Sequence, residues 1–214
     1  MLNIEKTTYG NRREARSEFV AQRFARYFDK KSVLDVGCFE APLRRILQTS
    51  AYTGIDFAGD PDIKVNLQES PCLPFNDQEF DNVICIDVLE HLDNLHSIFF
   101  ELIRVSRRHV IISLPNCWRD ARLKIARGKG DFAHYGLPPQ PPADRHRWFF
   151  NITQAHHFFR ENSQVAGVEI KECFVTEETG KPVISLLRHL RYPGERYLNR
   201  YAQTIWVVLE KRDA

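Results

Sequence analysis

A short apolar strand that runs into a glycine turn constrains this 214-residue chain most strongly. Residues 33–39 read Val-Leu-Asp-Val-Gly-Cys-Phe, and a second strand, residues 52–56, ends on Asp56. Gly37 lets the backbone approach a ligand closely, because it has no Cβ to obstruct the contact. An acid at the end of the neighbouring strand is where an open α/β sheet binds the hydroxyls of a ribose. The two strand ends therefore predict a ligand that contains adenosine.

The same turn limits which adenosine ligand fits. A pyrophosphate cofactor requires several glycines, because backbone N–H groups must surround two phosphates at a helix N-terminus. Gly37 stands alone here, and Phe39, Glu40 and Pro42 occupy the following positions. Because Glu40 would repel a phosphate, the sequence disfavours a dinucleotide-dependent dehydrogenase. It favours an adenosine ligand that carries no phosphate.

Apolar strands alternate with helical patterns over the first half of the chain, which predicts a mostly parallel sheet covered by helices on both faces. Strands are expected at about residues 31–36, 51–56, 63–65, 83–86 and 110–112. Helices are expected at 11–29, 42–48 and 95–103, then from Asn151, where Gln154 completes a capping box. Two β-like segments, 167–175 and 203–210, complete the pattern, with a helix between them that Pro193-Gly194 interrupts.

The expected fold class is α/β, a Rossmann-like three-layer sandwich with seven strands, mostly parallel, and an antiparallel last strand. A chain of this length is expected to form one domain, residues 1–214. Residues 116–150 interrupt the alternation and contain the run Gly-Leu-Pro-Pro-Gln-Pro-Pro at 136–142, which cannot join a central strand. We call residues 116–150 the roof segment, and expect it and a second insertion, about 181–200, to form a helical and irregular lid.

Composition excludes several classes of function. Five cysteines without a Cys-x-x-Cys pair argue against a disulfide framework and a zinc ribbon, and no metal site is expected. A net charge of +2 is too small to indicate a nucleic-acid partner. No apolar run approaches the roughly 20 residues that span a bilayer, and the first residues lack the apolar core of a signal peptide. No membrane partner is expected, and the cytoplasm is the expected location.

Five segments, in order along the chain, carry a family resemblance. Residues 33–38 resemble the first motif of class I S-adenosylmethionine-dependent methyltransferases, and Gly54-Ile-Asp56 resembles the second. Residues 73–92 are similar to the middle of the same family, and 111–116 and 146–150 to later stretches. The resemblance, closest to the type 11 methyltransferases, covers about residues 30–160. It implies that the chain is an enzyme with S-adenosylmethionine as its cofactor.

The resemblance also implies which residues hold the cofactor. Asp35 and Gly37 would lie beside its methionine portion, with Cys38 and Phe39 in the same turn, and Asp56 would bind the ribose. The adenine would lie against further residues, and its amino group would meet an acid or amide before the Leu-Pro-Phe motif. These expected residues are Phe57 beside the ring, Asn66 with the Leu67 backbone as first choice and Glu69 as second, and Asp87 at the mouth of the site.

The sequence departs from the family in its glycine loop. Phe39 and Ala41 replace the second and third glycines that are usual there. The Phe39 side chain must turn away from the cofactor or lie over its methionine chain. A second hypothesis follows from this departure, in which the chain is an inactive cofactor-binding scaffold or regulatory module.

Methyl transfer requires in-line alignment of nucleophile, methyl carbon and sulfur, and a base where the nucleophile is a hydroxyl or a protonated amine. The roof segment is the natural cover of the site, because ligands bind at the carboxyl ends of parallel strands. It offers His134, Tyr135, Asp144 and His146, of which His146 is the preferred base. Outside the roof, His91 follows Glu90 at the start of a helix-like segment, where both are expected mainly as capping residues.

Charge in the roof segment points to the acceptor. Between residues 119 and 147 there are seven Lys or Arg against three acids, and four more arginines follow between 188 and 200. Arginine forks suit carboxylates and phosphates. The sequence therefore predicts O- or N-methylation of a small molecule that carries a carboxylate or phosphate. Methylation of RNA or protein is a third hypothesis, against which the near-neutral net charge weighs.

Overall fold

The computed structural model describes residues 2–10, 12–47, 49, 51–132, 134–142 and 144–212, and these contain a single sheet of eight strands. The strand order is β1-β7-β8-β6-β5-β2-β3-β4, and β8 alone runs antiparallel to its neighbours. This confirms the mostly parallel sheet with an antiparallel last strand. The bounds are β1 Asn3–Thr7, β2 Ser32–Val36, β3 Ala51–Asp56, β4 Ile63–Lys64, β5 Phe80–Ile86, β6 Ser106–Pro115, β7 Val168–Glu178 and β8 Thr204–Lys211.

The strand that the sequence did not predict is β1, so the expected count of seven strands is corrected to eight. β1 pairs in parallel with the edge strand β7, from Asn3 opposite Phe174 to Thr7 opposite Glu178. Its five residues, Asn-Ile-Glu-Lys-Thr, contain one apolar side chain. A segment so polar shows no recognisable strand pattern in the sequence. It becomes a strand because it pairs with β7, whose edge it covers.

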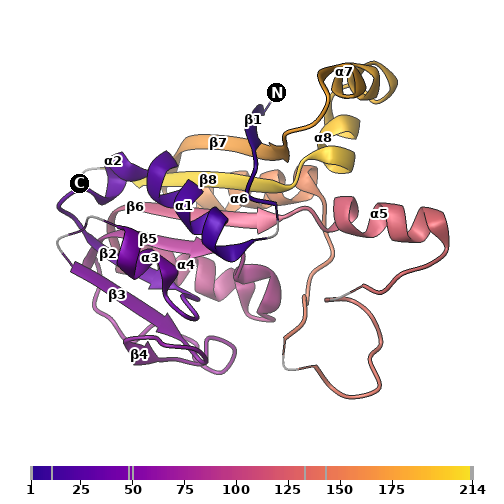
Figure 1. The fold of residues 1–214 in the computed structure, drawn as a ribbon. Coiled ribbons are helices and arrows are strands. Elements are labelled where there is room, and N and C mark those ends of the chain that lie inside the picture. Colours follow the sequence, from indigo (N-terminus) through magenta and orange to yellow (C-terminus); the bar gives the residue numbers. More distant parts are fainter. Residues whose placement is uncertain are drawn as a thin grey trace.

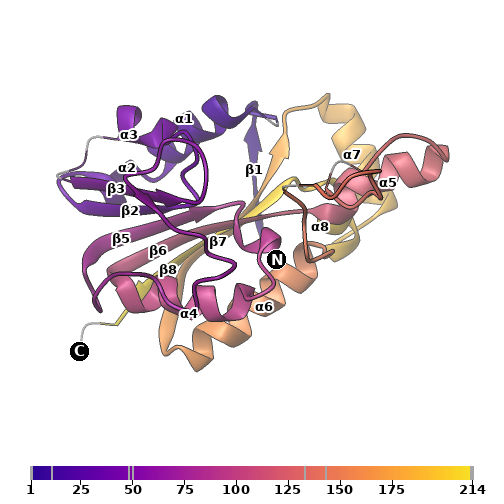
Figure 2. The same cartoon turned by 90° about the horizontal axis from the view of Figure 1, so that it is seen from below.

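Helices cover both faces of the sheet and make three layers, as expected (Figures 1 and 2). One face carries α1 Arg13–Arg23, α2 Ala25–Phe28 and α3 Pro42–Ile46, and the other carries α4 Leu95–Val105 and α6 Ile152–Val165. A separate apolar cluster lies on each face of the sheet. The cluster under α1, α2 and α3 contains Phe24 and Trp206, and the cluster under α4 and α6 contains Phe99 and Phe159. The expected helix at 11–29 is broken at Phe24, and its first residue, 11, lies outside the described residues, as does residue 48 of the expected helix 42–48.

The remaining helices lie beyond the carboxyl ends of the parallel strands (Figure 1). They are the 3-10 turn η1 Leu89–His91, α5 Cys117–Arg127, α7 Pro182–Arg191 and α8 Glu195–Tyr201. The break between α7 and α8 falls at the predicted Pro193-Gly194. Within the described ranges, no helix has both the length and the apolar character to cross a bilayer.

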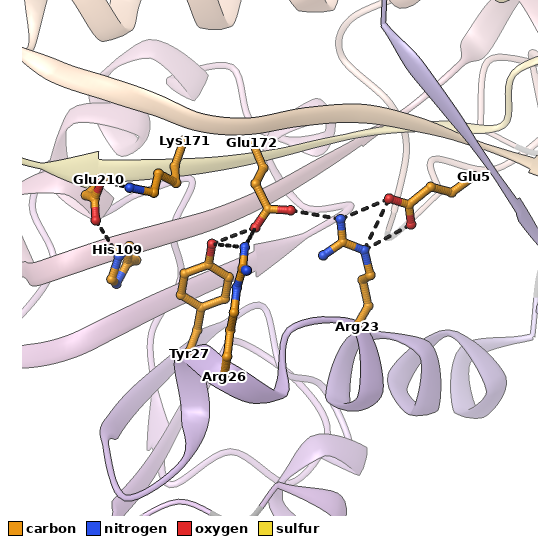
Figure 3. Close-up of polar contacts among 8 residues, drawn as sticks. All are labelled: Glu5, Arg23, Arg26, Tyr27, His109, Lys171, Glu172 and Glu210. Carbon is orange, nitrogen blue, oxygen red and sulfur yellow. Dashed lines mark hydrogen bonds and ion pairs between the residues drawn. The ribbon is translucent and has the colours of Figure 1, made fainter.

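A network of ion pairs holds the N-terminal elements to strand β7 (Figure 3). The Arg23 guanidinium of α1 lies 2.9 Å from Glu5 on β1 and 2.8 Å from Glu172 on β7. Tyr27 donates a further hydrogen bond of 2.5 Å to Glu172. Because the network joins four elements, α1, α2, β1 and β7, it fixes where α1 lies over the sheet. α1 carries two arginines of the site described below.

Two asparagines hold the roof segment to the core. Asn151 caps α6, and Gln154 completes the predicted capping box. Asn116 caps α5, and its side-chain amide also donates to the carbonyls of Leu198 and Ala202 at the end of α8. The start of the roof segment is therefore anchored to the end of α8, and its end leads directly into the capped α6.

Candidate functional site

The turn after β2 has a backbone that only glycine adopts without strain at its centre. Gly37 has φ +80°, in the left-handed region. A Cβ built there would lie 2.3 Å from Cγ2 of Val88, a contact that no packed structure tolerates. The Gly37 amide donates to the carbonyl of Ile55 on the neighbouring strand at 2.8 Å. The turn is therefore held between β3 and the segment that follows β5.

The two residues that replace the usual glycines also have left-handed backbones. Phe39 has φ 51° and Ala41 has φ 48°. The Phe39 amide donates to Asp56 at 2.9 Å, and the Phe39 ring lies under the guanidinium of Arg13 at 4.6 Å. A Cβ on Gly59 would lie 2.4 Å from the Phe39 carbonyl, so the adjacent loop also packs closely here. Residues 39 and 41 therefore have the backbone conformation typical of glycine although neither is glycine. The Phe39 ring packs against α1.

Asp56 lies at the end of β3, as predicted, and is 8% exposed. Its carboxylate accepts hydrogen bonds from the amides of Phe39 and Ala58, at 2.9 and 3.0 Å. A carboxylate has about four lone-pair sites, so these two bonds leave acceptor capacity for hydroxyl groups. Phe57 follows and is 60% exposed, with its ring free to cover a flat ligand.

Asp35 is buried at the end of β2, with 4% of its surface exposed. The Tyr52 hydroxyl donates to it at 2.5 Å. Burial raises the pKa of Asp35 to about 7, an effect that the Tyr52 hydrogen bond opposes. A carboxyl group with this pKa gains its charge most easily when a cation binds beside it.

The adenine-side residues have ordinary structural roles as well. Asn66 is exposed and accepts from the Gln68 amide at 3.1 Å, as in an Asx turn. The Leu67 carbonyl accepts from Asn94 at 2.9 Å. Glu69, the second choice, is exposed one turn further along. None of these contacts prevents ligand binding, and none requires it.

Asp87 follows β5 and stands between two cavities. It accepts from the Ser113 hydroxyl at 2.5 Å and forms an ion pair with Arg16 of α1. A small cavity of about 70 Å³ lies on one side, bounded by Asp35, Gly37 and Cys38. A larger cavity of about 430 Å³ lies on the other. Both are lined by Arg13, Arg16 and Asp87, so the larger cavity adjoins the glycine turn.

Residues of the roof segment supply nearly half of the larger cavity's lining, nine of nineteen. They include all four histidine, tyrosine and aspartate side chains that the sequence proposed: His134, Tyr135, Asp144 and His146. No described residue of the second insertion, 181–200, lines it. Three of the four arginines there lie over tyrosine rings instead, Arg200 over Tyr192 at 4.2 Å for example.

The roof histidines form one cluster with His91 of η1. The rings of His91 and His146 are 4.5 Å apart, and His134 stacks on His146 at 4.4 Å. Asp144 lies beside His91 rather than His146, with 2.5 Å between Oδ1 and Nδ1. His146 instead has its Nδ1 atom 2.6 Å from the Tyr135 hydroxyl. The Arg147 amide donates to the Glu90 carbonyl at 2.8 Å and joins the roof to η1.

Burial makes both inner histidines poor proton acceptors. Burial, together with smaller contributions from the neighbouring His91 and His134, lowers the pKa of His146 to about 3. Burial also lowers the pKa of His91, although Asp144 opposes the effect. A general base works best when its pKa lies near the operating pH, so neither neutral imidazole is well matched to that task alone.

Glu90 is the most unusual group in the cavity. It is 1% exposed, and neither of its carboxyl oxygens has a hydrogen-bond partner among the described residues. Burial raises the pKa of Glu90 well above its usual range, with a smaller contribution from Asp87. From the sequence, Glu90 was expected mainly to cap a helix. In the structure its side chain forms no capping hydrogen bond in η1.

Sequence reasoning also missed Arg13 and Arg16. They lie three apart on α1, and their signal was a pair of basic residues on the polar face of a helix, which usually indicates solvent exposure. Arg16 pairs with Asp87, whereas Arg13 has no carboxylate within ion-pair distance among the described residues.

Comparison with known proteins identifies the family. Residues 10–163, more than two thirds of the chain, match a family model described as a methyltransferase domain. The chain belongs to this methyltransferase family. Membership confirms the expectation of a class I enzyme that uses S-adenosylmethionine. The cofactor is thus supported by family, and the residues that hold it remain a proposal.

Individual relatives of this methyltransferase are distant. It is 30% identical over 86 residues to a ubiquinone biosynthesis O-methyltransferase of Rickettsia bellii, a match that covers 34% of this chain and 36% of the relative. The chain therefore spans about a third of the length of the curated relatives that it matches.

Solved structures share the fold of this methyltransferase at low identity. An S-adenosylmethionine-dependent methyltransferase from Archaeoglobus fulgidus superposes with a TM-score of 0.61 at 16% identity, covering 91% of this chain and 94% of that one. Magnesium protoporphyrin IX methyltransferase from Synechocystis, with bound S-adenosylhomocysteine, gives 0.54 at 15% identity, covering 93% and 83%. These likenesses confirm the fold class.

Proposed function

We propose that this methyltransferase transfers a methyl group to a hydroxyl of a small acceptor that carries one negative charge. The observation that carries the proposal is the cavity of about 430 Å³ that shares Arg13, Arg16 and Asp87 with the cavity at the glycine turn. Methyl transfer needs acceptor and cofactor in adjoining sites. The partial likeness to an O-methyltransferase supports oxygen as the methylated atom.

The glycine turn suits S-adenosylmethionine in three respects. Gly37 leaves the space that a side chain would fill, Asp56 keeps acceptor capacity for ribose hydroxyls, and the exposed Phe57 can cover the adenine. Asp35 would lie beside the cationic methionine portion, and Arg13 would bind the methionine carboxylate. Cys38, Phe39, Asn66, the Leu67 backbone and Asp87 complete the proposed cofactor site. When bound, the cofactor supplies an activated methyl group.

Charge in the larger cavity supports an anionic acceptor. Four basic side chains line it, against four acidic ones. Burial raises the pKa of Glu90 well above its usual range, which favours its neutral form and shifts the balance of the cavity toward positive charge. Lys124 on α5 is the side chain we assign to the acceptor's carboxylate or phosphate, because it lines the cavity without a carboxylate partner among the described residues, whereas Arg119 pairs with Asp120 and Glu178.

The reaction has a simple balance. The acceptor oxygen forms a bond to the methyl carbon while the carbon–sulfur bond breaks, and sulfur keeps the electron pair. The hydroxyl proton leaves toward the cluster of His134, Asp144 and His146 and then to water. We propose that these three residues remove the proton together, because the lowered pKa of His146 makes it a poor acceptor by itself. The roof segment excludes solvent from the site.

Phe39, which motivated the scaffold hypothesis, is accommodated by the loop. Its backbone follows a left-handed path, and its ring packs under Arg13. No described contact of Phe39 favours the scaffold hypothesis.

A panel of small hydroxylated acceptors tests the proposal. Each carboxylated compound is paired with its neutral amide, and release of S-adenosylhomocysteine is measured. We expect turnover of at least one carboxylated acceptor, and a rise of about tenfold in its KM in Lys124→Gln, with the neutral partner unaffected. Lys129→Gln, exposed on the same segment and outside the cavity, is the matched control. Preference for the neutral partners would contradict an anionic acceptor. Tight cofactor binding without any turnover would instead favour the scaffold.

A further inference from the structure

We propose that Glu90, His91 and His146 form a binding site for one divalent transition-metal ion at the wall of the acceptor cavity. One ligand atom from each residue lies within 4.8 Å of the others. All three residues line the cavity of about 430 Å³. The inference rests on the proposed function only for the role of the ion, because the site itself is argued from the side chains.

The first observation is the isolation of Glu90. Its side chain is 1% exposed, and both oxygens lack a hydrogen-bond partner among the described residues. A buried polar group without a partner destabilises the fold, and a charged one does so more strongly. A cation beside Glu90 would remove this cost, since buried carboxylates are stabilised by pairing or by metal coordination.

The second observation is how the two histidines are held. His146 has Nδ1 at 2.6 Å from the Tyr135 hydroxyl, and His91 has Nδ1 at 2.5 Å from Asp144. The Tyr135 hydroxyl therefore occupies Nδ1 of His146 and leaves its Nε2 for an ion. Nδ1 of His91 lies at ion-pair distance from Asp144 without a hydrogen bond to it, and the Nε2 atom of the same ring lies toward Glu90. Metal-binding histidines typically have this arrangement, because the outer partner fixes the tautomer and the orientation of the ring.

The spacing of the donors also suits a metal. Nε2 of His91 lies 3.7 Å from Oε1 of Glu90. Two donors in tetrahedral positions around Zn²⁺, each about 2.1 Å from the ion, are roughly 3.4 Å apart. Small side-chain rotations would bring the three donors into that range.

The donor types select the class of ion. Two imidazoles and one carboxylate suit Zn²⁺, Mn²⁺, Fe²⁺ or Co²⁺, whereas Mg²⁺ and Ca²⁺ prefer oxygen ligands alone. Three protein ligands leave coordination positions open, and in this site they face the acceptor cavity. An acceptor hydroxyl bound there would lose its proton more readily, because a cation lowers the pKa of an oxygen bound to it. The ion would thereby supply what the buried imidazoles lack as bases.

Metal binding can be measured without cofactor or acceptor. The tag-free, EDTA-treated full chain is titrated with Co²⁺, and heat and visible absorption are recorded. We expect one Co²⁺ per chain with a d–d absorption band. Glu90→Gln and His146→Gln should bind at least about 100-fold more weakly, and Asp144→Asn, which removes an outer partner, about tenfold more weakly. His157→Gln, exposed on α6 and outside the cavity, is the matched control and should bind like the parent.

The proposed metal site is contradicted if the parent binds no more Co²⁺ than Glu90→Gln, or if His157→Gln loses as much affinity as His146→Gln. Circular dichroism of each variant separates lost binding from lost folding, and Glu90→Gln keeps the side-chain shape so that it should fold. A separate assay of methyl transfer tests the role of the ion. Binding of one ion without any methyl transfer would contradict the proposed function but not the metal site. Full activity of the metal-free protein would contradict a catalytic role of the ion.

Discussion

The glycine turn and the roof segment meet at the same end of the sheet, yet they are built differently. The turn consists of backbone: Gly37 and Phe39 are held by hydrogen bonds to Ile55 and Asp56 within two neighbouring strand ends. The cluster under the roof consists of side chains, and Glu90 and His146 come from segments 56 residues apart. The turn can bind a common cofactor by shape, whereas the roof can vary with the acceptor while the turn stays unchanged.

The largest effect should come from Gly37→Ala. The variant places a Cβ 2.3 Å from Val88 Cγ2 at φ +80°. Left-handed strain and overpacking together cost about 4 kcal/mol, so we expect a large loss of unfolding free energy in urea and no detectable binding of S-adenosylhomocysteine by calorimetry. Gly180→Ala is the control, because its Cβ would meet nothing closer than 4.0 Å. Normal cofactor affinity in Gly37→Ala would show that the backbone of this turn does not hold the ligand.

Asp35 should make stability depend on pH. Its pKa is raised by burial from 3.8 to about 7, so the folded protein holds a proton that the unfolded chain releases. This contribution is fully present below about pH 4 and is lost as pH rises toward 7, which amounts to roughly 3 kcal/mol between pH 5 and pH 8. Urea unfolding at both values measures it.

Asp35→Asn, which has no charge to lose, is the reference for that measurement. The parent should lose more stability than Asp35→Asn as pH rises from 5 to 8. In addition, a bound cation favours the ionised carboxylate, so S-adenosylmethionine affinity should rise with pH in the parent alone. If unfolding free energy changed with pH equally in the two proteins, ionisation of Asp35 would not be the cause of the pH dependence.

Trp148→Phe tests the roof by itself. The indole N–H of Trp148 donates to the Leu92 carbonyl at 2.7 Å and fastens the roof beside η1. Loss of one such bond costs about 1 kcal/mol, so trypsin should cleave the roof after Arg127, Lys129 or Arg145 about fivefold faster. Affinity for S-adenosylhomocysteine should stay within twofold. A large loss of that affinity would mean that the roof and the turn do not act separately.

The turn could be predicted from the sequence because its determinants are local. A buried strand, Gly37 and Asp56 occur within 24 residues, and the pairing of parallel strands brings their ends together. The four roof residues could be nominated as well, since a proline-rich break after β6 can only lie at that end of the sheet. The break between α7 and α8 follows from a similarly local pattern, Pro193-Gly194.

The partners of these residues could not be predicted. Asp144 contacts His91, and Tyr135 contacts His146, through a fold of the roof that no periodicity encodes. Glu90 begins a helical turn, where an acid is ordinarily a surface residue, so only three-dimensional packing reveals that it is buried without a partner. Strand β1 was missed for the same reason, because its pairing with β7 determines its conformation.

The smallest effect concerns the joint between the roof segment and α6. Asn151 caps α6 directly after the roof, and its side chain accepts from the Gln154 amide at 3.0 Å while Gln154 accepts from the Asn151 amide at 3.1 Å. Asn151→Ala should lower the unfolding free energy by about 1 kcal/mol. Gln154→Ala should cost less, and the double variant less than the sum of the two, because the bonds are reciprocal. Trypsin cleavage of the roof should be unchanged, since Trp148 still holds it to η1. Faster cleavage in Asn151→Ala would show that the order of the roof depends on the core helix that follows it.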